Sequence, residues 1–133
     1  MELEELCYKG AGYKPLVLTE NWQVAQLNYA EEQEACALEK LDQHDFTDET
    51  FTLVNGRALL ITYESETGNY ALTPLKRGST YNVPAMVWHN IVMEEGSSVM
   101  ITEGRDAHLK GFAQIPMPQA VKQALSAYVQ KHW

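Results

Sequence analysis

Two short patterns, about thirty residues apart, hold the residue types in this sequence that could do chemistry. The first pattern is His44-x4-Glu49-x6-Gly56, and the second is Gly78-x5-Pro84-x4-His89. Two imidazoles and a carboxylate are groups with which proteins bind divalent transition metals. The sequence therefore predicts a site for a divalent metal ion (Mn, Fe, Ni or Zn) that uses His44, Glu49 and His89.

Many short strands separated by turn signals must position these residues, and this rhythm is typical of a β-sandwich or β-barrel. We expect strands at residues 16–19, 22–29, 35–42, 49–55, 57–64, 70–74, 80–83, 89–93, 99–103 and 111–115. Asn55-Gly56 lies between two apolar runs and predicts a type I′ hairpin. Residues 118–132 predict one helix, opened by Pro118 and carrying the apolar stripe Val121, Leu125, Tyr128 and Val129.

The two-residue period of a strand decides which side chains face inward. One register places an apolar set in the barrel interior, namely Phe51, Leu53, Ile91 and Met93. His44, Glu49 and His89 then point into the same interior near one end, and Asp42 shares a face with His44. A buried polar cluster is costly unless its members pair with each other or with a cation. A metal ion would satisfy all three residues at once.

Each residue also has an ordinary structural interpretation when it is taken singly. A lone histidine in a strand usually makes a structural hydrogen bond or lies on the surface, and Glu49 could be a solvated turn acid. We expect His108 in a surface turn and His132 in the last turn of the helix, where a cation favours the helix dipole. Cys36 reads as a small buried hydrophobic residue rather than a nucleophile.

The two patterns together resemble the two signature motifs of the cupin superfamily. His44, Glu49 and Gly56 match the first motif, and Gly78, Pro84 and His89 match the second, over about residues 36–103. The resemblance implies an all-β double-stranded β-helix, or jelly-roll barrel, with the expected C-terminal α-helix added. It also implies that His44, Glu49 and His89 are metal ligands.

The sequence departs from the family pattern at three positions. Asp42 replaces the first histidine of the first motif, and Met86 and Met93 replace a glycine and an asparagine of the second. Asp42 could be a fourth metal ligand, could orient His44, or could mark a site that has lost its metal. Two histidines and one carboxylate still form a competent metal-binding triad, which favours a retained metal.

The segment from Val83 to His89 also resembles the Pro-Pro-x-x-Trp-His segment of the cupin-like sugar-nucleotide ketoisomerases. That resemblance implies metal-free proton transfer with His44 or His89 as the catalytic base. Three functions follow from the two resemblances. The first is a metal-dependent enzyme acting on a small polar metabolite such as a sugar or a carboxylate, with His44 and His89 as its catalytic residues. Candidate contacts for its substrate are Arg57, Tyr63, Tyr70 and Tyr81. The second is this isomerase, and the third is a non-catalytic module that binds a small molecule.

Length, charge and cysteine usage limit the partners and the compartment. A chain of 133 residues predicts one domain over residues 1–133, with the barrel at about 15–115. A formal net charge of −8 argues against nucleic acid and membrane partners. The N-terminus lacks a signal-peptide pattern, and Cys7 and Cys36 form no CxxC motif, so we expect a cytoplasmic protein with reduced thiols. Trp88 and Val92 form an outward apolar set that predicts a homodimer.

Overall fold

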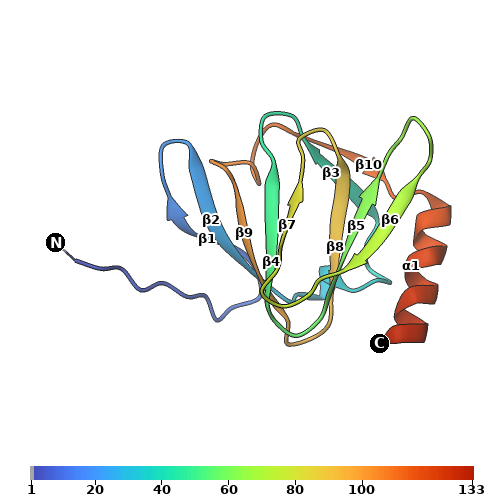
Figure 1. Cartoon of the computed structure of the whole chain (residues 1–133), viewed down its shortest axis with the longest axis horizontal. Helices are drawn as coiled ribbons and strands as arrows, with labels where there is room; N and C mark the ends of the chain where they lie inside the picture. The colour runs from blue at the N-terminus through green and yellow to red at the C-terminus, as the bar shows by residue number, and fades with distance from the viewer. Residues whose placement is uncertain (1) are drawn as a thin grey trace.

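The computed structural model describes residues 2–133 as two antiparallel five-stranded sheets and one long helix (Figure 1). In the first sheet the strand order is β1 (Gly12–Leu18), β2 (Trp22–Asn28), β9 (Ser98–Gly104), β4 (Glu49–Asn55) and β7 (Thr80–Val83). In the second sheet the order is β10 (Phe112–Pro116), β3 (Lys40–His44), β8 (Trp88–Met93), β5 (Ala58–Tyr63) and β6 (Tyr70–Pro74). A 3-10 turn, η1 (Glu31–Gln33), precedes β3, and α1 (Gln119–His132) follows β10.

The main core lies between the two sheets and follows the predicted alternation. Phe51 and Leu53 of β4 face Ile91 and Met93 of β8, and each of the four side chains is at most 4% exposed. The predicted interior register is therefore confirmed for this apolar set. Since His89 and Glu49 continue the same alternation on β8 and β4, they are directed into the same interior.

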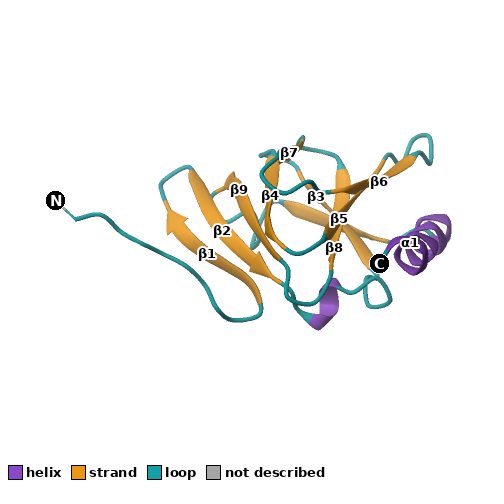
Figure 2. Cartoon of the chain, turned by 60° about the horizontal axis from the view of Figure 1, so that its bottom comes forward, coloured by secondary structure: helices purple, strands orange, loops and turns teal. Residues whose placement is uncertain are grey.

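A second core lies between the outer face of the second sheet and α1. Val121 and Leu125 of the helix pack against Leu59, Ile61 and Val92 of the sheet, and all five are buried. Figure 2 shows the helix beside this sheet, on the side away from β1 and β2. Strand β5 is consequently buried on both faces, which explains its unbroken Ala-Leu-Leu-Ile run.

The prediction of an outward apolar set at Trp88 and Val92 is wrong for Val92. Val92 is only 1% exposed because α1 of the same chain covers it, and Trp88 is half-buried against the same cluster. This face is therefore not the free surface on which the homodimer was predicted.

The predicted type I′ hairpin at Asn55-Gly56 is also wrong. Strand β4 belongs to the first sheet and β5 to the second, so Asn55-Gly56 carries the chain from one sheet to the other. Only Gly56 of the pair has positive φ (80°), whereas a type I′ turn needs positive φ at both central residues. Long-range pairing of β4 with β9 and of β5 with β8 determines this connection.

Two strand boundaries and one burial prediction need correction. Residues 35–37 form a turn in which the Leu38 N–H donates to the Glu34 carbonyl, and the strand expected at 35–42 runs instead from Lys40 to His44. Cys36 lies in this turn, where its side chain is exposed rather than buried. The first strand begins at Gly12 rather than at 16, and its Pro15 is tolerated because β1 pairs on one side only. The helix prediction is confirmed, with Pro118 at the N-cap of α1.

Among the described residues, no helix combines the length and the apolar character that crossing a membrane requires.

Replacement of Gly56 by alanine tests why the first pattern has a glycine at this position, where the backbone lies close to Ser97. A Cβ at residue 56 would lie 2.2 Å from Ser97 Oγ and 2.8 Å from Ser97 Cα, whereas one at Gly68 would meet nothing within 4 Å. Both glycines have positive φ, so each substitution carries a conformational cost of about 1–2 kcal/mol. We expect Gly56→Ala to lower the free energy of unfolding by clearly more than Gly68→Ala does, as measured by urea denaturation. Equal losses would show that the contact with Ser97 is unimportant.

Candidate metal centre

His44, Glu49 and His89 come from three strands and meet at one point inside the fold. Glu49 Oε1 lies 3.1 Å from His44 Nε2 and 2.8 Å from His89 Nε2. Strands β3 and β8 belong to the second sheet and β4 to the first, so the cluster joins the two sheets. The ligating atoms of the three residues lie within 4.8 Å of one another, and each side chain is less than a tenth exposed. This His-Glu-His group could hold a metal ion.

The hydrogen bonds of His89 call for either a proton or a metal ion on its Nε2. Its Nδ1 lies 2.9 Å from the carbonyl oxygen of Val87, which can only accept, so Nδ1 carries a hydrogen. In a neutral ring Nε2 would then present a lone pair to Glu49 Oε1, and the two acceptors would repel each other. Either a proton on Nε2 or a metal ion shared with Glu49 removes the conflict. The contact with Val87 is also the kind of outer hydrogen bond that fixes the ring of a metal-binding histidine.

His44 is held differently. Its Nε2 faces both Glu49 and Glu103, with Glu103 Oε1 at 3.5 Å. Its Nδ1 is buried and has no hydrogen-bond partner among the described residues. The hydrogen bond to Glu49 raises the pKa of His44 against the opposing effect of burial.

The carboxylate and the two imidazoles stabilise each other's charged forms. Burial alone would raise the pKa of Glu49, but the hydrogen bonds and charges of His44 and His89 bring it below its ordinary value. Burial likewise opposes the charged form of His89, and the bond to Glu49 raises its pKa above the ordinary range. In the metal-free protein the imidazolium protons therefore balance the buried carboxylate, and a metal ion would have to replace those protons.

The sequence prediction missed Glu103, which lies beside Glu49 on the adjacent strand. Glu49 and Glu103 are direct partners in the β4–β9 ladder. The side chain of Glu103 is 1% exposed, and its Oε1 has no hydrogen-bond donor among the described residues. Burial, followed by the charge of Glu49, raises the pKa of Glu103 to about 7. The alternation of Val99, Ile101 and Glu103 is the sequence signal that could have placed this carboxyl inside.

A second polar cluster extends from Glu103 across the first sheet to β2 and β1. The Tyr13 hydroxyl donates to Glu103 Oε2, and Gln23 Nε2 donates to the Tyr13 oxygen at 2.7 Å. Gln23 Nε2 also lies 2.9 Å from His108 Nδ1. Burial and the bond to Glu103 raise the pKa of Tyr13, which therefore stays protonated. His108, predicted to lie in a surface turn, is partly buried and packs against the Tyr13 ring.

Asp42 is close to the cluster but is not drawn into it. It is the register partner of His89 in the β3–β8 pair, and its Oδ1 accepts a hydrogen bond of 2.8 Å from Gln114 Nε2. It is half-buried and does not belong to the group whose ligating atoms lie within 4.8 Å of one another. Among the predicted ligands, the structure thus brings together His44, Glu49 and His89, with Asp42 at the margin.

A cavity of about 270 Å³ is lined by the His-Glu-His group, by Asp42 and by three members of the second polar cluster, namely Glu103, Tyr13 and His108. Its remaining walls are apolar or carry amides, and they include Phe51, Ile101, Phe112, Gln33 and Gln114. The pocket contacts suggested by sequence alone, Arg57, Tyr63, Tyr70 and Tyr81, do not line this cavity.

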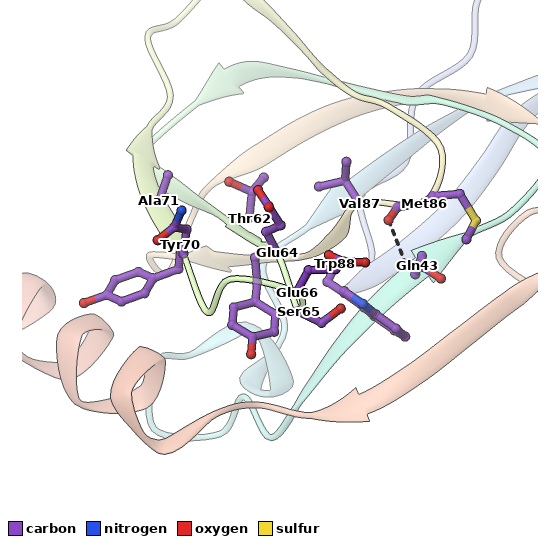
Figure 3. A pocket seen from close by; sticks show the side chains of 12 residues that line it. Gln43, Thr62, Glu64, Ser65, Glu66, Tyr70, Ala71, Met86, Val87 and Trp88 are labelled. Carbon is purple, nitrogen blue, oxygen red and sulfur yellow. Dashed lines mark hydrogen bonds between the residues drawn. The ribbon is translucent and has the colours of Figure 1, made fainter.

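A larger cavity of about 410 Å³ lies elsewhere, between the β5–β6 end of the second sheet and the loop before β8. Figure 3 shows Tyr70 and Trp88 in its wall, together with the hydrogen bond from Gln43 to the Met86 carbonyl. Its lining includes Glu64 and Glu66 but no histidine. Of these two cavities, only the smaller one is therefore lined by the predicted metal ligands.

The chain is similar to known proteins in its three-dimensional structure but not detectably in its sequence. No family model matches the sequence, and no curated protein matches it significantly. A cupin-2 domain protein from Shewanella frigidimarina superposes with a TM-score of 0.55 at 20% identity, over 74% of this chain and 85% of that one. An RmlC-like cupin with a double-stranded β-helix fold from Methanocaldococcus jannaschii gives 0.52 at 14% identity, over 81% and 94%. The chain has the cupin fold. The all-β jelly-roll architecture predicted from the two motifs is therefore confirmed.

A third structural neighbour was solved with a metal. The cobalt(II) form of HppE in complex with substrate gives a TM-score of 0.50 at 16% identity, over 70% of this chain and 52% of that one. At these identities the likeness establishes the fold, while the roles of individual residues rest on the geometry of this site.

The raised pKa of Glu103 predicts how stability changes with pH in the metal-free protein. The folded protein holds a proton on Glu103 up to about pH 7, whereas the unfolded chain releases it near its ordinary, lower pKa. The contribution of Glu103 to stability therefore falls as pH rises through this window. Glu103→Gln cannot ionise. Relative to wild type, its free energy of unfolding should be higher by about 1–3 kcal/mol near pH 8 and little changed near pH 5.

Urea denaturation in the presence of a chelator would measure this difference. Glu64→Gln, at an exposed position, is the matched control for loss of one negative charge. If Glu103→Gln and Glu64→Gln responded to pH in the same way, the carboxyl of Glu103 would not be perturbed as described.

Proposed function

We propose that this cupin-fold protein binds one divalent transition metal through His44, Glu49 and His89 and acts on a small polar molecule in the adjoining cavity. The main observation in support is the placement of His89 Nε2 against an acceptor oxygen while Nδ1 donates to Val87. The donor set of two imidazoles and one carboxylate suits manganese, iron, nickel or zinc. A metal held there would polarise a bound oxygen of the substrate as a Lewis acid.

The surrounding residues have defined tasks in this proposal. The Val87 carbonyl fixes the ring of His89, and Glu49 supplies the negative charge that holds a cation between the imidazoles. Phe51 and Ile101 limit water on one side, which strengthens every charge interaction in the site. Glu103 can hold or release a proton near neutral pH next to His44. His44 and His89 are the proposed catalytic residues because both reach the centre of the cavity.

Proton transfer without a metal is the second candidate function. It is favoured by the contact of 3.5 Å between His44 Nε2 and Glu103 Oε1, which places a base and an acid together in the same cavity. In that case the protein would be an isomerase, or a binding module if no reaction occurs. Metal content distinguishes the first candidate from these two.

Substitution of the proposed ligands should abolish metal binding. We expect wild-type protein, purified without chelator, to contain about one transition metal ion per chain and to gain about 3 kcal/mol of stability at a metal concentration a hundredfold above Kd. His44→Ala and His89→Ala should each weaken metal binding by more than about 100-fold, since even outer-sphere partners of metal ligands contribute 10–100-fold. Element analysis and thermal unfolding with added metal would measure both effects.

His132→Ala is the matched control, because His132 is an exposed histidine on α1 outside the cavity. It should bind metal like wild type. Wild-type protein that contains no stoichiometric metal, and whose melting temperature does not respond to added metal, would contradict the proposal.

A homodimer remains our prediction, now on a different surface. Strand β1 pairs only with β2, and its exposed edge carries Val17 and Leu18 at 37% and 50% exposure. Figure 1 shows the segment before β1 leading away from the sheets, and Leu3 on it is 96% exposed. A second copy of the chain could cover both features, because open strand edges and apolar patches favour association.

Light scattering at micromolar concentration should therefore give twice the chain mass, and Leu18→Lys should shift the protein to the monomer. Thr50→Lys, on a strand paired on both sides, should leave the dimer intact. A monomeric wild type would contradict the prediction.

A reducing, cytoplasmic location also stays a proposal, supported by the free thiols of Cys7 and Cys36.

A further inference from the structure

We propose that the cavity beside the His-Glu-His cluster selects a small, hydrogen-bond-donating molecule that carries no negative charge. The inference rests on the proposed function, since it names the class of molecule on which that site acts. Three features of the cavity wall support it: the sign of its charges, the direction of its amides and its size.

The charged groups of the wall other than histidine are all acidic. Asp42, Glu49 and Glu103 line the cavity, and no lysine or arginine does so among the described residues. No basic side chain other than histidine is therefore available in the wall to pair with an anionic ligand. A carboxylate or phosphate on the ligand would instead approach the carboxylates of Asp42 and Glu49, and like charges brought together at a binding site weaken binding.

Glu103 adds a buried oxygen, Oε1, that makes no hydrogen bond within the described chain and has His44 Nε2 3.5 Å away. Tyr13 and Gln23 both approach its Oε2, while Oε1 has no donor among the described residues. An unsatisfied buried carboxyl oxygen costs free energy, which a hydroxyl or ammonium group of a ligand would recover. This oxygen marks the cavity as a ligand site independently of the acidic charge.

The amides of the wall also present acceptors. Gln33 Nε2 donates to the Ile91 carbonyl and Gln114 Nε2 to Asp42, each at 2.8 Å. Both partners can only accept, so the nitrogen of each amide must be the atom directed at the protein. The amide oxygens of Gln33 and Gln114, and the second oxygen of Asp42, accept no hydrogen bond from the described residues, although Gln114 is open to solvent. A ligand with several O–H or N–H groups matches this surplus of acceptors.

The volume of about 270 Å³ limits the ligand to a small metabolite. It lies below the range of about 300–1,000 Å³ that is usual for sites of drug-sized ligands. A sugar nucleotide would therefore be excluded by its size as well as by its diphosphate. A polyol and a small amine share the required chemistry, and the experiment below separates them.

Three six-carbon compounds that differ at one terminal group provide the test. D-glucitol ends in a hydroxymethyl group, 1-amino-1-deoxy-D-glucitol in an ammonium and D-gluconate in a carboxylate. We expect wild-type protein, with its metal content measured on the same sample, to bind the neutral or the cationic compound at millimolar concentration in ligand-observed NMR. Gluconate should bind at least about tenfold more weakly. The better of the first two compounds distinguishes a polyol site from an amine site.

Charge-removing variants assign the selectivity to the cavity. In Asp42→Asn and in Glu103→Gln the preference against gluconate should shrink severalfold, whereas Glu64→Gln, in the wall of the other cavity, should keep it. Tighter binding of gluconate than of both other compounds, or no binding of any of the three, would overturn the inference. A metal-free protein that still discriminates against gluconate would refute the proposed function but retain the inference. A metal-loaded protein that prefers gluconate would do the reverse.

Discussion

The buried carboxylate of Glu49, held between two imidazoles, is the interaction on which the site depends. A charge with so little exposure is tolerated only when its environment supplies the opposite charge. His44 and His89 supply it from the opposite sheet, and this explains why the cluster forms where the two sheets face each other. The carboxylate thus gives the two layers a polar contact at the end of an otherwise apolar core.

Glu103 adds a second buried carboxyl group beside Glu49, and the two repel each other when both are ionised. Two carboxyls directly opposite each other on adjacent strands repel when both are ionised, and the β4–β9 ladder fixes them in that position. Burial and this repulsion raise the pKa of Glu103, whereas the two imidazoles keep the pKa of Glu49 low. Bound protons and bound cations both relieve the repulsion. Occupancy of the site and stability of the fold are therefore coupled through the same pair of residues.

The sequence predicted those parts of the structure that depend on local period and on motif spacing. The alternation along β4 and β8 places Phe51 and Ile91 inside, and the histidine and glutamate of the motifs follow at even offsets from them. The helix could also be predicted from local sequence, because Pro118 and an apolar stripe define it. The cupin fold followed from the order and spacing of the two motifs.

The remaining parts depend on which strands become neighbours, and local sequence does not contain that information. Asn55-Gly56 has the composition of a hairpin, but its flanking strands pair with β9 and β8 in different sheets. Tyr13 and His108 reach the site only because β1, β2 and the segment after β9 fold against each other. Val92 looked exposed because nothing in its own strand indicates that α1 packs over it.

The helix has a consequence for how the protein is made. Both sheets are complete once Pro116 has been synthesised, yet the outer face of the second sheet then still presents Leu59, Ile61 and Val92 to solvent. An apolar sheet face of this kind is prone to self-association until it is covered. A chain that ended before residue 119 would leave this apolar face uncovered and would be prone to aggregate rather than to form a smaller barrel.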